Sequence, residues 1–212
     1  MATNTTCVGA VQTNVLRISR LTSTFHIDAG ASNLYTTDSV IEIVSNPIYG
    51  ADTDLEQQNG SGDVCVSFSR DGTYKRHDLT MSLCTLDAQL LELLANEILV
   101  TSGGNDIGSR FNTEANDQWV CLEAWQSVVE DGSTTGEYVH WIWPKCQFRR
   151  GQTTRNNGIL TVPLSGKAFF NPNIGLGPAG DWPTTFKEPD SWYIDSSHPA
   201  AQCQYQSAAT GS

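Results

Sequence analysis

The chain has 212 residues, which is enough for one sizeable domain or two small ones. Its hydrophobic fraction is 39%, and no run approaches the roughly 18 consecutive apolar residues of a membrane helix, so no membrane partner is expected. A formal net charge of -11 disfavours a protein that grips duplex DNA, because such binding relies on lysine and arginine contacts to phosphates. Residues 1–9 lack the features of a secretory signal, so we expect folding in a cytoplasm.

The first part of the chain predicts a polar arm followed by strands. Residues 1–13 are small and polar and read as an N-terminal arm. Strands are expected at residues 15–21 and 37–45, and the second is rich in β-branched side chains. In a strand, side chains alternate between faces, so Asp38 and Glu42 are predicted to share one face.

Residues 46–63 form a long acidic stretch with four carboxylates and neither lysine nor arginine. A connection of more than about 12 to 15 residues is uncommon in a compact domain unless it is functional or disordered. Because apolar side chains punctuate the stretch, we expect an extended loop that makes contacts. The residues expected to make them are Ile48, Tyr49, Asp52, Asp54, Leu55 and Glu56.

After this loop, the sequence predicts a strand at residues 64–68, a turn at 70–73 and a long strand at 74–84. Alternation on the long strand turns a polar set of side chains outward. That set is Asp78, Thr80 and Ser82.

One helix is predicted at residues 87–99, where leucines recur at helical spacing and Asp87 is a suitable N-cap. A loop follows to residue 116. Residues 118–129 and 137–143 then predict a β-hairpin that carries four tryptophans. Clustered tryptophans belong to a core, a subunit interface or a sugar-stacking platform, and the sequence leaves these open.

The last predicted strands are residues 146–149 and 159–170, and a basic turn joins them. Pro163 lacks a backbone donor, which favours an edge or a bulge for the second strand. Beyond residue 183 the chain is irregular and reads as a C-terminal arm at 184–212. The basic patch suits an acidic neighbour, such as the acidic loop of another copy, or is a solvated turn. Its members are Arg149, Arg150 and Arg155.

Catalytic and metal-binding motifs are absent from the sequence. Gly175–Gly180 matches the dinucleotide fingerprint by letter, but Pro178 and Pro183 prevent the helix that would bind a pyrophosphate. The six cysteines form no Cys-x-x-Cys pair and have no zinc-ligand spacing with the four histidines. We therefore expect no cofactor, no metal and no enzymatic activity, although His77 and His140 leave acid–base chemistry open.

The order of these segments resembles that of the major tail tube proteins of long-tailed, siphovirus-type bacteriophages that infect actinobacteria. The resemblance covers about residues 14–183. The segments that carry it are Leu16–Leu21, Asn46-Pro47, Asn59–Gly62, the helix after Cys84, Trp143-Pro144 with the strand to Phe170, and Asn171–Pro183. It implies a β-sandwich with one helix at residues 14–183, flanked by the two arms.

The resemblance also implies a function in the phage virion. Such proteins assemble as hexameric rings that stack into a tube, through which DNA passes without specific binding. Assembly would take place in the host cytoplasm, with further copies and other tail proteins as partners. The implied lumen-facing residues are Asp38, Glu42, Asp78, Thr80 and Ser82, the acidic loop would reach the adjacent ring, and the implied subunit contacts are Arg149, Arg150, Arg155 and Trp182. The alternatives are a minor tail, capsid-decoration or carbohydrate-binding β-sandwich protein, and a secreted-type hydrolase.

Overall fold

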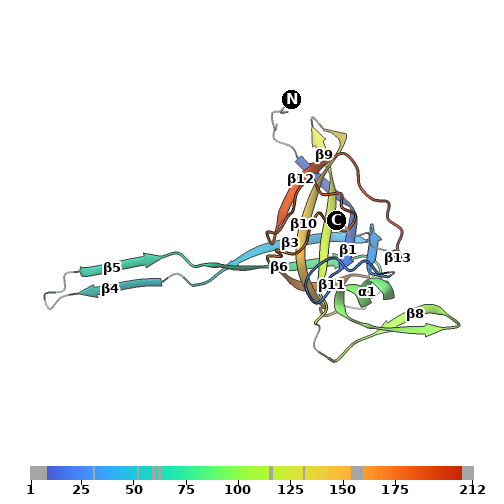
Figure 1. Cartoon of the computed structure of the whole chain (residues 1–212), viewed down its shortest axis with the longest axis horizontal. Helices are drawn as coiled ribbons and strands as arrows, with labels where there is room; N and C mark the ends of the chain where they lie inside the picture. Colours follow the sequence, from blue (N-terminus) through green and yellow to red (C-terminus); the bar gives the residue numbers. More distant parts are fainter. Residues whose placement is uncertain are drawn as a thin grey trace.

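The computed structural model describes residues 9–30, 32–51, 53–58, 61, 64–114, 117–130, 132–153 and 160–206. They form a mainly β protein with one short helix, as the sequence predicted (Figure 1). The elements are β1 (Gly9–Arg20), β2 (Leu34–Thr37), β3 (Val40–Tyr49), β4 (Thr53–Gln58), β5 (Val64–Arg70), β6 (Tyr74–Leu83), α1 (Ala88–Ala95), β7 (Ile98–Ser102), β8 (Asn105–Arg110), β9 (Val120–Glu130), β10 (Ser133–Arg150), β11 (Val162–Ala168), β12 (Ser191–Asp195) and β13 (Tyr205–Gln206).

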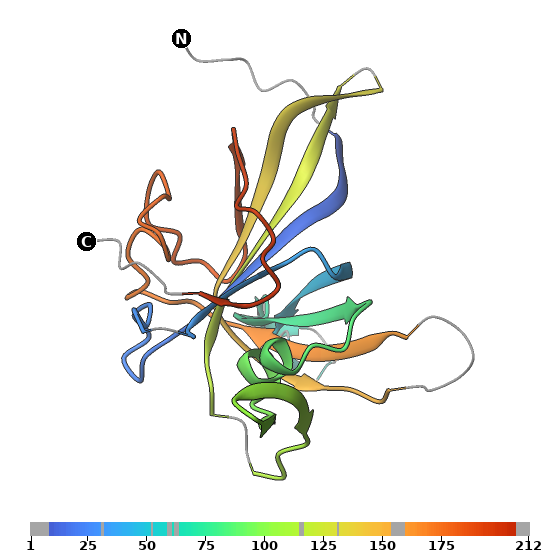
Figure 2. The same ribbon diagram turned by 90° about the vertical axis from the view of Figure 1, so that its right-hand side faces the viewer.

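A nine-stranded antiparallel sheet dominates the fold, with the order β13-β2-β1-β9-β10-β11-β6-β3 and with β12 paired to β10. β2 and β3 are neighbours in sequence but lie toward opposite ends of this order. The chain therefore crosses from one half of the sheet to the other at residues 38–39. Figures 1 and 2 show the result: β1, β9 and the first part of β10 run steeply across the direction of β3 and β6.

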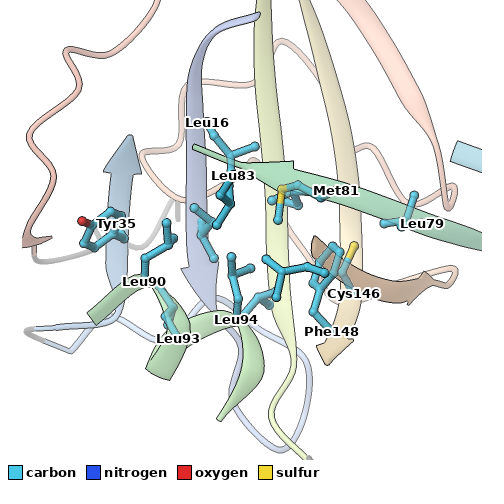
Figure 3. Packing of buried hydrophobic residues seen from close by; sticks show 14 of the residues in the cluster. Leu16, Tyr35, Leu79, Met81, Leu83, Leu90, Leu93, Leu94, Cys146 and Phe148 are labelled. Carbon is cyan, nitrogen blue, oxygen red and sulfur yellow. The ribbon is translucent and has the colours of Figure 1, made fainter. Parts of the chain in front are cut away.

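The main hydrophobic core lies between the two halves of the sheet and α1 (Figure 3). Leu79, Met81 and Leu83 of β6 alternate inward, and Leu83 lies next to Leu16 of β1. The helix adds four leucines that are at most 1% exposed: Leu90, Leu91, Leu93 and Leu94. Apolar alternation on the strands and a leucine stripe on the helix thus fill one interior.

The helix is shorter than the predicted 87–99. Its start was predicted correctly, since the Asp87 carboxylate accepts a hydrogen bond of 3.0 Å from the amide of Leu90. It ends because Asn96 adopts a left-handed conformation with φ 55°, and its amide donates back to Glu92. Ile98 consequently begins β7, and the β7–β8 hairpin occupies the end of the predicted helix and much of the predicted loop to residue 116.

The acidic stretch 46–63 was wrongly predicted as a loop. β3 continues into β4, which pairs with the returning β5, and the amide of Gly50 donates to the Thr73 carbonyl at 2.8 Å between the two ladders. Residues 70–73 therefore continue the returning chain and do not reverse it. Figure 1 shows β4 and β5 as a two-stranded arm that projects from the body along the line of β3 and β6. We call residues 49–74 the hairpin arm.

Several other strands differ in extent from the sequence prediction. β10 runs through Pro144 as one strand, because a register shift between Trp143 and Cys146 accommodates the proline. Pro163 was expected at an edge or bulge, but β11 lies between β10 and β6, with Pro163 near its start. Parts of both expected arms belong to the sheet, since β1 begins at Gly9 and the C-terminal region supplies β12 and β13.

Candidate functional site

Four strands, β3, β6, β11 and the end of β10, present one continuous polar surface on the side opposite the main core. Side chains on directly opposed residues of an antiparallel pair point to the same face. Glu42 therefore lies beside Ser82, and Val44 beside Thr80. Asn46 is opposed to Asp78 in the same ladder. We call this surface the polar face.

Four of the five predicted lumen residues lie together on the polar face: Glu42, Asp78, Thr80 and Ser82. Asp38 is separate, because it precedes β3 in the short crossing from β2, where its carboxylate lies 3.9 Å from the Cys203 sulfur. The expectation that Asp38 and Glu42 share one strand face fails for a second reason. A register shift between Val40 and Glu42 interrupts the alternation.

The polar face carries mixed charge, whereas the sequence suggested an acidic one. Register brings Lys167 of β11 opposite Asp78, and Arg149 of β10 opposite Ser165. Arg76 belongs to the same face and forms a 2.7 Å ion pair with Asp78. The sequence did not reveal that β10 and β11 lie beside β6 in the sheet, so Arg149 and Lys167 were not assigned to this face. Alternation along β10 and β11 turns both side chains outward.

A shallow groove lies on this face, with a volume of about 370 Å³. Its walls come from β6, β10 and β11. The lining side chains include Asp78, Thr80, Gln147, Arg149, Ser165 and Lys167.

The two described members of the predicted basic cluster do not lie together. Arg149 and Arg150 are adjacent on β10 and so point to opposite faces, with Arg149 exposed on the polar face. Arg150 instead makes a 2.8 Å ion pair with Glu97, which is buried beside the helix end. Arg155 lies outside the described residues.

The hairpin arm contains most of the residues predicted for inter-ring contact. Ile48 and Tyr49 end β3, and the exposed Tyr49 ring packs edge-on against Tyr74 at 5.9 Å. Asp54, Leu55 and Glu56 belong to β4, whereas Asp52 lies outside the described residues.

Trp182 does not provide a free subunit contact, because it is only 3% exposed and packs within the protein. Its indole nitrogen donates a 2.8 Å hydrogen bond to Glu123 of β9. Glu123 also binds Arg17 and approaches His140 at 3.0 Å, so it is the centre of a buried charged network. We correct the prediction accordingly: Trp182 anchors the C-terminal region to the sheet.

This network perturbs the pKa of its charged members. Burial alone would raise the pKa of Glu123, but the positive charge of Arg17 and hydrogen bonds from His140 and Arg17 lower it to about 2. For Arg17, burial opposes the charge, yet Glu123 and Asp181 outweigh it and the pKa is raised. Both groups are therefore held in the charged state.

A second polar cluster lies on the inner side of β3 and β6. The Ser45 hydroxyl lies 2.7 Å from Nδ1 of His77 and donates a 2.7 Å hydrogen bond to Asp190. Asp190 approaches the same nitrogen of His77 at 3.4 Å. In a catalytic triad, the serine and the carboxylate contact different ring nitrogens. The cluster therefore links Asp190 to β3 and β6 through hydrogen bonds. Its geometry differs from that of an activated nucleophile.

Next to this cluster is a cavity of about 310 Å³ lined in part by Ser45, Trp141, Trp143 and Asp190. The rings of Trp141 and Trp143 are nearly parallel, with an interplanar angle of 15° and centroids 6.4 Å apart. Trp192 continues the row beside Trp141 and is 53% exposed. Trp143, Trp141 and Trp192 therefore form a row that runs from the core to the surface, and Trp192 was not among the tryptophans predicted to cluster.

Within the described part of the chain, no group of three or more histidine, cysteine, aspartate or glutamate side chains could hold a metal ion. No helix among those residues is long and apolar enough to cross a membrane.

Comparison with known proteins gives little further information. No family model and no curated protein matches the chain. Among solved structures, it is similar to one described as the cryo-EM structure of the anti-feeding prophage cap, the tube terminating cap of that particle. The two share 11% identity over 79% of this chain and 92% of that chain, with a TM-score of 0.28. Similarity at this level supports no functional conclusion, so the proposal below relies on the chain's own features.

Proposed function

We propose that the protein is a structural subunit of a phage tail, and that its copies assemble into stacked, hexameric rings that form the tail tube. The proposal follows the resemblance of its sequence to major tail tube proteins. The single observation that carries it is the open edge strand β3, which ends the sheet order and leads directly into the projecting hairpin arm.

The edge of β3 supports the lateral contact within a ring. Its ten residues pair with β6 on one side only, among the described residues. Unpaired backbone groups on an edge strand are a template for pairing with another chain. Ile41 on this strand is 53% exposed, which adds apolar area for a neighbour to bury. When such a contact joins different surfaces of successive copies and closes, it forms a ring.

The hairpin arm supports the axial contact between rings. β4 and β5 pair only with each other among the described residues, and they project away from the core. A two-stranded ribbon is at best marginally stable in water by itself. A neighbouring ring would supply the missing surface, and the arm's four carboxylates at residues 46–63 would select a complementary partner there.

The polar face supports the channel wall. Threonine and serine hydroxyls on β6 and β11 keep this side of the sheet wet, and few apolar groups interrupt it. In the proposed tube it lines the lumen, where DNA passes without sequence-specific binding. Other tail proteins would bind the ends of the tube, and the site of action is the virion, after assembly in the host cytoplasm.

A carbohydrate-binding β-sandwich is the second candidate, and the tryptophan row favours it. Trp192 exposes a ring next to Trp141, and Trp141 lines a cavity whose walls are partly polar and partly apolar. Rings in such surroundings can stack on sugars. Under this alternative, the purified protein would stay monomeric and bind glycans.

Sedimentation velocity over a range of concentrations distinguishes the two candidates. The tail tube proposal expects species that grow with concentration, up to rings and stacks. A strictly monomeric protein at the highest concentration would contradict it, and saturable binding of a glycan array by that monomer would favour the second candidate.

A further inference from the structure

We propose that the groove on the polar face is a phosphate-binding site in which Arg149 and Lys167 hold one phosphate group between them. The site deepens the proposed function, because it gives the channel wall a chemical contact with passing DNA. Only the source of the phosphate, which is the passing DNA, depends on the proposed function. The groove itself follows from the register of three strands.

Those strands bring the cations and the hydroxyls into two adjacent rows. In one row, Arg149 of β10 is opposed to Ser165 of β11, which is opposed to Thr80 of β6. In the next row, Lys167 of β11 lies between Gln147 and Asp78. The groove's lining residues carry polar side chains that project from this face, except Gly166 and Leu79.

Arg149 and Lys167 are diagonal neighbours across β10 and β11, a relationship that places side chains about 7 to 8 Å apart at the backbone. Two like charges at this separation repel each other. Among the described residues, no carboxylate forms an ion pair with either of them, and the nearest acid in register, Asp78, is paired with Arg76. A bound anion between the two cations would remove the repulsion.

Phosphate is the anion that suits these groups best. A guanidinium presents parallel N–H donors that match two phosphate oxygens, and an ammonium adds a mobile positive charge. The hydroxyls of Thr80 and Ser165 lie in the same row as Arg149, next to the row of Lys167, where they can donate to a third oxygen. A carboxylate ligand would leave part of this donor set unused.

The formal net charge of -11 does not prevent such a contact. At physiological ionic strength, the Debye length is about 8 Å, so distant carboxylates are screened and the local arrangement decides. The groove offers no deep recess for bases, and contacts to phosphates carry no sequence information. We therefore expect weak, salt-sensitive and sequence-independent contact between this groove and passing DNA.

The first test uses inorganic phosphate and the soluble subunit, and records amide and arginine side-chain NMR shifts. Saturable shifts are expected at Arg149, Ser165 and Thr80. The double variant Arg149→Gln/Lys167→Gln should lose them. Arg110→Gln removes one charge from the exposed end of β8 and should keep them. Matching thermal unfolding of the three proteins would show that each is folded.

The second test uses a short duplex DNA and fluorescence anisotropy at several salt concentrations. Loss of both cations should weaken binding and reduce the slope of log K against log salt by about 0.9 for each lost phosphate contact. Phosphate-induced shifts without duplex binding would assign the groove to a free phosphate. Shifts that are absent, or that persist in the double variant, would overturn the site.

Assembly is read separately by sedimentation, so the groove and the tube proposal can fail independently. Tubes without phosphate binding would leave the proposed function intact and refute the groove. Phosphate binding by a protein that stays monomeric would support the groove and refute the tail tube proposal.

Discussion

The guanidinium of Arg17 binds the carboxylate of Glu123 through two hydrogen bonds of 2.7 Å, one from Nε and one from an Nη nitrogen. The pair joins neighbouring strands β1 and β9, and both side chains are buried. Trp182 and Asp181 bind the same two residues from the C-terminal region. This interaction therefore fixes residues 181–182 against the sheet.

Glu123→Gln should destabilise the subunit by about 3 to 5 kcal/mol, because it leaves Arg17 charged and buried without its main partner. Chemical denaturation measures the change. Glu130→Gln is the matched control, since it removes an exposed carboxylate from the end of the same strand and should cost less than about 0.5 kcal/mol. Equal, small effects of the two variants would show that the network contributes little.

Acid should unfold the protein in a range set by Glu123. Its pKa is about 2 in the folded state, against an ordinary value of 4.5. A depressed pKa stabilises the fold fully above the ordinary value, and that contribution is lost as the pH falls from about 4.5 to about 2. The loss is of the order of 3 kcal/mol. Denaturation midpoints measured between pH 6 and 2 should fall in wild type and in Glu130→Gln, and a flat profile would contradict the network's role.

The elements that the sequence predicted well depend on local signals. The leucine spacing and the Asp87 cap located the start of α1, and strand alternation located the polar side of β6. The errors concern pairing between distant segments. The acidic composition of residues 46–63 resembles a loop, but pairing between β4 and β5 makes it a ribbon.

The charge of the polar face was mispredicted for the same reason. Lys167 and Arg149 reach it only because β10, β11 and β6 are neighbours, and their sequence positions do not reveal that order. Similarly, nothing in the local sequence of Trp182 indicates that it binds Glu123, which lies 59 residues earlier.

The hairpin arm should become protected from hydrogen exchange only on assembly. In free subunits, amides of β4 and β5 should exchange rapidly, because a two-stranded ribbon has no third strand or core to stabilise it. In tubes, contact with the next ring should slow the exchange. Mass spectrometry of peptides from residues 53–70 measures both states, with β9 as the internal control that stays slow in each. Equal hydrogen-exchange rates for the arm in free subunits and in tubes would show that it makes no contact between rings.

A charge on the β3 edge should block ring closure without unfolding the subunit. Ile41→Lys places a cation on an exposed position of the strand, and lysine on an edge disfavours pairing with another chain. Light scattering should then report monomers under conditions in which wild type forms larger species. Ile107→Lys, at a 65% exposed position on the β7–β8 hairpin, should assemble normally. Assembly by the β3 variant would exclude this edge from the interface.

A three-dimensional electron microscopy reconstruction of the assembled protein would show directly how the subunits are arranged. We expect stacked rings in which β3 lies at the lateral contact, the hairpin arm reaches the next ring, and Thr80 and Ser165 face the channel. Particles that remain single subunits at high concentration, or tubes in which the polar face lies on the outside, would contradict it.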